Sequence, residues 1–281
     1  MAEVKIITDS TAYLPPELIA RYGIRVVPLK VVFGAEAYAE GVDISNEEFY
    51  SKLMEASTLL TTSQPSVGDF LQVYGEVTRE GGSILSIHIS SKLSATVSTA
   101  LTAKGELPQA QIEVVDSLST SMGLGMVVLA AARAADEGQS LSQIRAATEK
   151  VIRSMNLFFI VDTLEYLRKG GRIGGAAALV GTALRIKPVL YLKEGQIEVL
   201  AKVRTKRRAL KRLLELMAER MLGGTSVHIA IIHAHAAEEA TALEKEVRAR
   251  FNCAEIYLSE LGPAIGAHVG PRAIGLAFYA D

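Results

Sequence analysis

The sequence predicts an α/β protein of two domains, and three observations support this class. Through the first half, short segments rich in β-branched residues alternate with helical segments, which is typical of a parallel sheet covered by helices. In the second half, strand-like segments 188–192 and 196–200 flank a glycine-containing turn, which indicates an antiparallel hairpin. The length of 281 residues exceeds the commonest single-domain size. We therefore expect a three-layer parallel domain over 1–155 and a mixed-sheet α/β domain over 156–281.

The elements of the first domain follow from the spacing of apolar residues and from helix-start signals. The predicted strands are 4–9, 24–29, 83–89 and 112–117. One predicted helix begins near Leu14 and another near Asn46. A third covers 65–79, and a fourth ends near Lys104. Two alanine-rich helices follow, over 122–137 and 141–155. Asp9 ends the first strand. Ligand sites of parallel sheets lie at the carboxyl ends of the strands, and Asp9 is at such an end.

Two hydroxyl-rich segments precede predicted helices. The first is 61–66, where Ser66 stands three residues before Asp69, as in a variant helix cap. The second, 90–98, contains five hydroxyl residues between the end of a strand and a helix. Each segment alone is typical of an ordinary cap, but helix starts also offer free N–H groups to an anion. The chain has neither a GxxxxGK[ST] loop nor a strand followed by GxGxxG and a helix, which argues against a nucleotide site.

The second domain is predicted to mix strands and helices. The predicted strands are 157–162, 188–192, 196–200, 227–233, 255–258 and 273–279, and the predicted helices are a long one that ends at Leu222 and another over 237–250. Between the first two strands, 163–175 is glycine-rich and basic, which favours a mobile loop. A helix over 176–184 has small residues on most faces, so another helix or an acyl chain could pack closely against it.

A histidine stands alone in the segment 262–271, near the end of the sequence. Prolines and glycines bracket it, and small apolar residues surround His268. Taken alone, this pattern is most often a buried histidine bonded to a backbone carbonyl. His233 and His235 could mimic a metal-ligating pair, but no third ligand is evident, so we expect no metal.

Composition excludes several classes of function. Thirty Lys and Arg against thirty-one Asp and Glu give a formal net charge of -1, so no global field attracts nucleic acid. The single cysteine, Cys253, excludes an internal disulfide. Neither a signal peptide nor an apolar run of membrane-spanning length is present, and we expect a cytoplasmic protein.

Six segments in register resemble the DegV family. They are 8–11, 61–66, 90–96, 168–173, 203–206 and 262–271. The resemblance spans nearly the whole chain and implies a protein that binds a long-chain fatty acid between two α/β domains. In many bacteria such proteins are the acyl-binding subunit of a fatty acid kinase, whose separate catalytic subunit supplies the nucleotide.

The resemblance also implies roles for individual residues. The carboxylate contacts of the family fall on Thr62, Ser63, Ser94, the backbone N–H of Ala95, and His268. Arg204 matches an arginine near the headgroup, and the basic segment with Arg168, Lys169 and Arg172 matches a surface that docks the kinase. The family usually has glycine where this chain has Ala95, so strain is expected there if the backbone is unusual.

We therefore expect a carrier that is not itself an enzyme, with its ligand in the seam between the domains and 176–184 as one wall. The expected partners are a fatty acid and a kinase subunit, with room for transient contact with a membrane, and no cofactor is expected. One alternative is an acyl hydrolase or transferase that uses Ser94 and His268, although the GxSxG motif is missing. A sensor of a sugar phosphate or a nucleotide is a further alternative.

Overall fold

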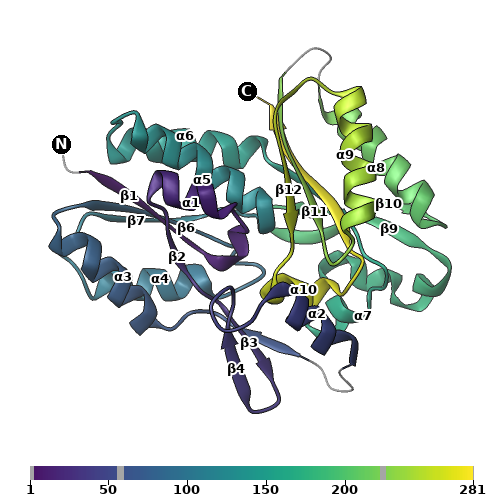
Figure 1. Ribbon diagram of the computed structural model, residues 1–281, viewed down its shortest axis with the longest axis horizontal. Helices are drawn as coiled ribbons and strands as arrows, with labels where there is room; N and C mark the ends of the chain where they lie inside the picture. Colours follow the sequence, from purple (N-terminus) through teal and green to yellow (C-terminus); the bar gives the residue numbers. More distant parts are fainter. Residues whose placement is uncertain (1–2, 56–59, 222–225, 281) are drawn as a thin grey trace.

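The computed structural model describes residues 3–55, 60–221 and 226–280, which form a parallel four-stranded sheet, a mixed six-stranded sheet and a small antiparallel sheet (Figure 1). This arrangement confirms the predicted fold class. The last helix of the first half, α6, ends at Ser154, and the first strand of the six-stranded sheet begins at Asn156. The exact division into domains at 155/156 stays a prediction.

The first sheet has the order β2-β1-β6-β7, and all of its strand pairs are parallel. Its strands are β1 (Val4–Asp9), β2 (Arg25–Val27), β6 (Ser83–His88) and β7 (Ile112–Asp116). The two central strands are mostly buried, which explains their continuous apolar and small-residue composition. The predicted strand over 24–29 is real but shorter.

Helices cover both faces of this sheet and complete the three-layer unit. They are η1 (Ser10–Ala12), α1 (Pro16–Tyr22), α3 (Val67–Arg79), α4 (Thr96–Gly105), α5 (Ser121–Asp136) and α6 (Leu141–Ser154). A capping box confirms the helix start at Ser66: the Ser66 hydroxyl accepts from Asp69 N, and the Asp69 carboxylate accepts from Ser66 N. The predicted start at Pro65 is therefore two residues too early.

A small sheet with the order β4-β3-β5 lies beside the parallel one and was not predicted. It consists of β3 (Lys30–Phe33), β4 (Glu36–Ala39) and β5 (Thr61–Ser63), and α2 (Asn46–Glu55) follows β4. The segment with Thr62 is thus a strand and not a turn, because Thr62 pairs with Val31 of β3. Threonine is a good strand residue, but a stretch of three carries too little alternation to be recognised.

The six-stranded sheet has the order β10-β9-β8-β13-β11-β12, and only β11 and β12 pair in parallel. Its strands are β8 (Asn156–Ile160), β9 (Lys187–Lys193), β10 (Gln196–Val203), β11 (Val227–His233), β12 (Cys253–Glu260) and β13 (Ile274–Ala280). The predicted hairpin is confirmed as β9 and β10. Helices α8 (Lys206–Arg220) and α9 (Ala237–Arg250) cover the outer face, and the predicted end at Leu222 lies outside the described residues.

Two segments of the second half differ from prediction. The basic segment is not wholly a loop, because α7 (Glu165–Lys169) forms there and is braced by an ion pair between Lys169 and Glu165. The small-residue segment is a 3-10 helix, η2 (Gly174–Arg185), and not an α-helix. What packs against its start is strand β10: a side chain added at Gly174 would lie 2.3 Å from the carbonyl oxygen of Ile197.

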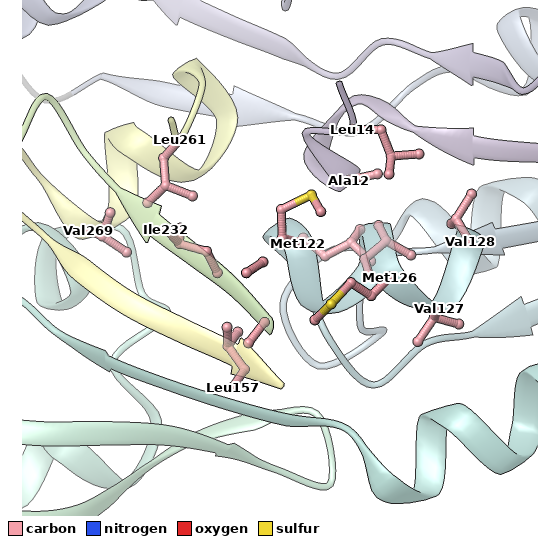
Figure 2. Close-up of a cluster of buried hydrophobic side chains, with 14 of the residues drawn as sticks. Ala12, Leu14, Met122, Met126, Val127, Val128, Leu157, Ile232, Leu261 and Val269 are labelled. Carbon is pink, nitrogen blue, oxygen red and sulfur yellow. The ribbon is translucent and has the colours of Figure 1, made fainter. Parts of the chain in front are cut away.

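Helices α5 and α10 (Pro263–Val269) lie at the seam between the two large sheets. Figure 2 shows how one apolar cluster crosses it: Met122 of α5 lies on one side, and Ile232 and Leu157 of the six-stranded sheet lie on the other. The core is therefore continuous between the two halves of the chain. That continuity makes the seam a place where an enclosed apolar cavity can form.

Candidate functional site

A cavity lies in this seam and encloses about 890 Å³ of space not filled by protein atoms, counting the part open to solvent. Apolar side chains from both halves form most of its wall, among them Ile89, Leu157, Phe159, Leu192, Ile232 and Val269. A mostly apolar wall with a few polar groups is typical of a small-molecule site.

One group of polar side chains on the wall comes from four separate elements. Thr62 and Ser63 lie on β5, Ser94 precedes α4, Arg172 follows α7, and His268 lies on α10. The segments that were singled out as hydroxyl-rich, basic or histidine-containing thus meet at one cavity. We call Thr62, Ser63, Ser94, Arg172 and His268 the polar cluster.

His268 has one buried ring nitrogen that lacks a hydrogen-bond partner in the described part of the chain. Its Nε2 lies 2.8 Å from Thr62 Oγ1, whereas its buried Nδ1 has no hydrogen-bond partner among the described residues. Burial, assisted by the nearby charge of Arg172, lowers the pKa of His268 to about 4. The imidazole is therefore neutral near pH 7 and can donate from one nitrogen only.

The loop after α7 contacts the His268 ring through Gly170 and is held in place by Arg172. A side chain added at Gly170 would lie 2.2 Å from His268 Nδ1, so only glycine allows this close approach. Arg172 spans the same loop, because its Nε donates to Leu93 O at 3.1 Å and its guanidinium donates to Gly170 O at 2.7 Å. Arg172 thereby joins the loop to the segment that carries Ser94.

A buried carboxylate from the first half of the chain holds the start of α10. Glu40 Oε1 accepts from Ala264 N at 2.7 Å and from Tyr13 OH at 2.8 Å, and Ser10 Oγ donates to its other oxygen. The Tyr13 hydroxyl also accepts from Ile265 N at 3.1 Å. Burial raises the pKa of Glu40 to about 7.

Sequence reasoning missed Glu40, because a single glutamate after a short strand carries no motif. The one local signal in the sequence is Gly262, which stands directly before the proline that opens a helix. In the structure, a side chain at this position would lie 2.6 Å from Glu40 Oε1.

Several residues expected at the site lie elsewhere. Ala95 is exposed and does not line the cavity. Its φ of -77° and ψ of 9° are ordinary, so the condition under which strain was expected is not met. Arg204 is exposed beyond the end of β10 and is also not part of the cavity wall. Arg168 and Lys169 lie exposed on α7, and the side chains of η2 that the structure describes, at 174–181, do not contribute to the wall. Arg172, expected on a docking surface, is exposed and also lines the cavity.

A second buried polar network, at the end of β1, stays apart from the cavity. Asp9 accepts from His88 Nδ1 at 3.1 Å and from Ile89 N at 2.9 Å, and His88 Nε2 lies 2.6 Å from Ser86 Oγ. The order of serine, histidine and aspartate is that of a catalytic triad. However, the side chains of all three are fully buried, and none of them lines the cavity.

A model of the family described as "Uncharacterised protein, DegV family" matches residues 3–281. The chain belongs to the DegV family. A DegV domain-containing protein of Streptomyces coelicolor is 43% identical over 275 residues, which cover 97% of each chain. A solved structure of a DegV family protein from Thermus thermophilus, described as showing fatty acid binding, matches this chain with a TM-score of 0.95 and 38% identity. The match covers 99% of this chain and 100% of that one.

A second solved structure, DegV of Bacillus subtilis, is described as a fatty acid binding protein. It has a TM-score of 0.92 and 33% identity, with complete coverage of both chains. None of the helices in the described part of this DegV chain combines the length and apolar character needed to cross a bilayer. No group of three or more metal-ligating side chains occurs in 3–55, 60–221 and 226–280.

Proposed function

We propose that this DegV protein binds a long-chain fatty acid, with its carboxylate at the polar cluster and its hydrocarbon chain in the apolar part of the cavity. The observation that carries the proposal is the unsatisfied hydrogen-bonding capacity of the polar cluster at the wall of an apolar cavity. About fifteen buried methylenes at about 0.8 kcal/mol each offer roughly 12 kcal/mol before the costs of binding. Two related DegV proteins are described as binding fatty acids, which supports this ligand class.

The carboxylate is held by hydroxyls and a guanidinium in this proposal. When His268 Nε2 donates to Thr62 Oγ1, the Thr62 hydroxyl proton is free to point at the ligand. Ser63 and Ser94 supply further hydroxyls, and Arg172 supplies a positive charge that partly offsets the cost of burying the anion. A bound carboxylate would raise the pKa of His268 from its depressed value.

A carrier explains the geometry better than a hydrolase does. In a serine hydrolase, the histidine bonds to the nucleophilic hydroxyl. Here the Ser94 hydroxyl bonds to Thr96 Oγ1 at 2.9 Å, and His268 bonds to Thr62. We further propose that the carrier presents its ligand to a separate kinase subunit, with the exposed Arg168, Lys169 and Arg204 on the docking surface and Arg172 at the headgroup.

Binding is tested by extracting the purified protein with organic solvent and identifying acyl chains by mass spectrometry. A stoichiometric fatty acid, or saturable uptake of palmitate or oleate by the stripped protein, is expected. Absence of both would refute the proposal.

Presentation is tested with a cognate kinase subunit and ATP. Arg204→Glu should copurify with a normal amount of fatty acid and raise the half-saturating concentration in the kinase assay, because a charge at a rim mainly sets the rate of encounter. Arg172→Glu should instead weaken fatty acid binding itself, because it places a second negative charge beside the carboxylate. If Arg204→Glu loses fatty acid and Arg172→Glu changes only the kinase assay, then Arg204 lies at the headgroup and Arg172 on the docking surface.

A further inference from the structure

Three consecutive hydroxyl residues at the start of α5 are buried without hydrogen-bond partners. Ser119, Thr120 and Ser121 are 3%, 7% and 2% exposed, and their hydroxyl oxygens have no partner among the described residues. Buried polar groups in folded proteins are nearly always paired, so each exception calls for a missing partner. Where such a hydroxyl faces a cavity, a polar group of a ligand can be its partner.

Two of the three side chains line the cavity. Thr120 and Ser121 belong to its wall, whereas Ser119 does not and lies instead against Gly123, where an added side chain would come within 2.2 Å of its hydroxyl. The hydroxyls of Thr120 and Ser121 form no bond to the polar cluster. They lie at the start of an element that carries no member of the polar cluster, and they add a second group of polar side chains to the wall.

The start of α5 adds hydrogen-bond donors to this site. Thr120 occupies the N-cap position of a helix of sixteen residues, but its side chain makes no capping bond. The first N–H groups of a helix have no partner within the helix, and the helix dipole favours electron-rich atoms there. Next along α5, Met122 faces the apolar side chains of Ile232 and Leu157, so the surroundings are otherwise apolar (Figure 2).

The chemistry of the site matches a hydroxyl group better than it matches a methylene. A hydroxyl can accept from the helix start or from one serine or threonine and donate to the other. A methylene leaves both side chains unsatisfied, and neither residue offers the positive charge that a second carboxylate would need. We infer that Thr120 and Ser121 form a second polar subsite of the cavity, which binds a hydroxyl group carried on the hydrocarbon chain of a fatty acid.

This inference rests on the proposed function, and it is tested by a positional scan. Calorimetry with the stripped protein compares stearate with stearates that carry one hydroxyl at the 2, 3, 6, 10 or 12 position. One isomer is expected to bind about tenfold more tightly than the other isomers, because only its hydroxyl reaches the subsite and the others bury a hydroxyl against apolar side chains. If stearate itself does not bind, the proposed function fails. If stearate binds and no isomer stands out, only the subsite is overturned, and a trapped water satisfies the two hydroxyls.

Variants then assign the preference to the two residues. Thr120→Val and Ser121→Ala should each reduce the preference for the selected isomer over the other isomers, a ratio measured within each variant, to about threefold or less. Ser121→Gly provides a second removal of the hydroxyl that suits the backbone, since Ser121 has a φ of 52°. Ser119→Ala is the matched control, because it removes a buried unpartnered hydroxyl outside the cavity and should leave the preference unchanged. A preference that survives Thr120→Val combined with Ser121→Gly overturns the inference.

Discussion

His88 and His268 are both withdrawn from solvent, but their hydrogen bonding differs. Asp9 and Ser86 occupy the two ring nitrogens of His88, and the ring of Phe70 packs edge-on against it with centroids 5.0 Å apart. His268 has a partner at one nitrogen only and lies on a cavity wall. The network with the residue types of a catalytic triad is thus closed and structural.

The difference shows that incomplete hydrogen bonding marks a binding site better than residue type does. A buried network whose donors all have acceptors has no hydrogen-bonding capacity left for a ligand, so a substitution in it can only remove bonds. Incomplete hydrogen bonding at a cavity wall leaves capacity for a ligand, because the Thr62 hydroxyl proton is free when His268 Nε2 donates to Thr62 Oγ1. A protein that keeps such a site accepts a cost in stability. Five variants test this contrast and the surroundings of the cavity.

The largest effect is expected from Asp9→Ala. The change removes the acceptor of Thr11 N, Ile89 N and His88 Nδ1 in a fully buried place. It should lower the free energy of unfolding by about 3–5 kcal/mol in urea denaturation. Fatty acid affinity of the folded fraction should stay unchanged, and a loss of affinity at full stability would place this network in the binding site.

The next effect concerns pH and Glu40. Its pKa is raised in the folded chain to about 7 from 4.5, so the stabilising contribution is complete below pH 4.5 and is lost as the pH rises through 7. Glu40→Gln should remove up to about 3 kcal/mol of this dependence between pH 5 and pH 8, as followed by urea denaturation.

His268 provides the opposite sign in the same measurements. Its folded pKa, about 4, lies below the ordinary 6.5, so its contribution is present above pH 6.5 and is lost as the pH falls through 4. His268→Gln should flatten only this acid side. A Glu40→Gln protein whose alkaline side matches the parent would contradict the assignment.

A smaller effect is expected from Gly170→Ala. The new methyl group would displace the His268 ring from Thr62 and weaken fatty acid binding by about 1.5–3 kcal/mol, roughly 10- to 150-fold. Gly75→Ala is the matched control, since nothing lies within 4 Å of the added atom on α3. Equal affinities of the two variants in a displacement assay would separate His268 from binding.

The smallest effect is expected from Ala95→Gly. Ala95 occupies the N-cap position of α4 with ordinary backbone angles, and glycine is preferred over alanine at helix caps. We expect a gain in stability of about 0.5 kcal/mol or less and an affinity within about twofold of the parent. A large gain in affinity would show that Ala95 limits contact with the headgroup.

Sequence reasoning reached most of the fold because helices and buried strands carry long patterns. It failed at β5 and α10, which are three and seven residues long and are fixed by partners distant in the chain. It identified Thr62, Ser94 and His268 as site residues, and the structure brings these three to one cavity. Arg204 and Ala95 do not line the cavity, and their roles stay predictions, since a resemblance gives position along the chain and not the direction of a side chain. Thr120 and Ser121 look like an ordinary helix start, and only burial without partners distinguishes them.

The bonds that hold α10 also set the order in which the molecule can fold. A helix of seven residues is too short to persist alone, and its start is held by Glu40, 224 positions before Ala264 in the chain. Tyr50 adds a similarly remote bond to Leu261 O at 2.8 Å. Contacts of such separation form only after the chain between them has collapsed, because closing the loop costs entropy first. We therefore expect α10 to form late in folding, so that the part of the cavity wall with His268 is completed only after Glu40 and Tyr50 have met the C-terminal segment.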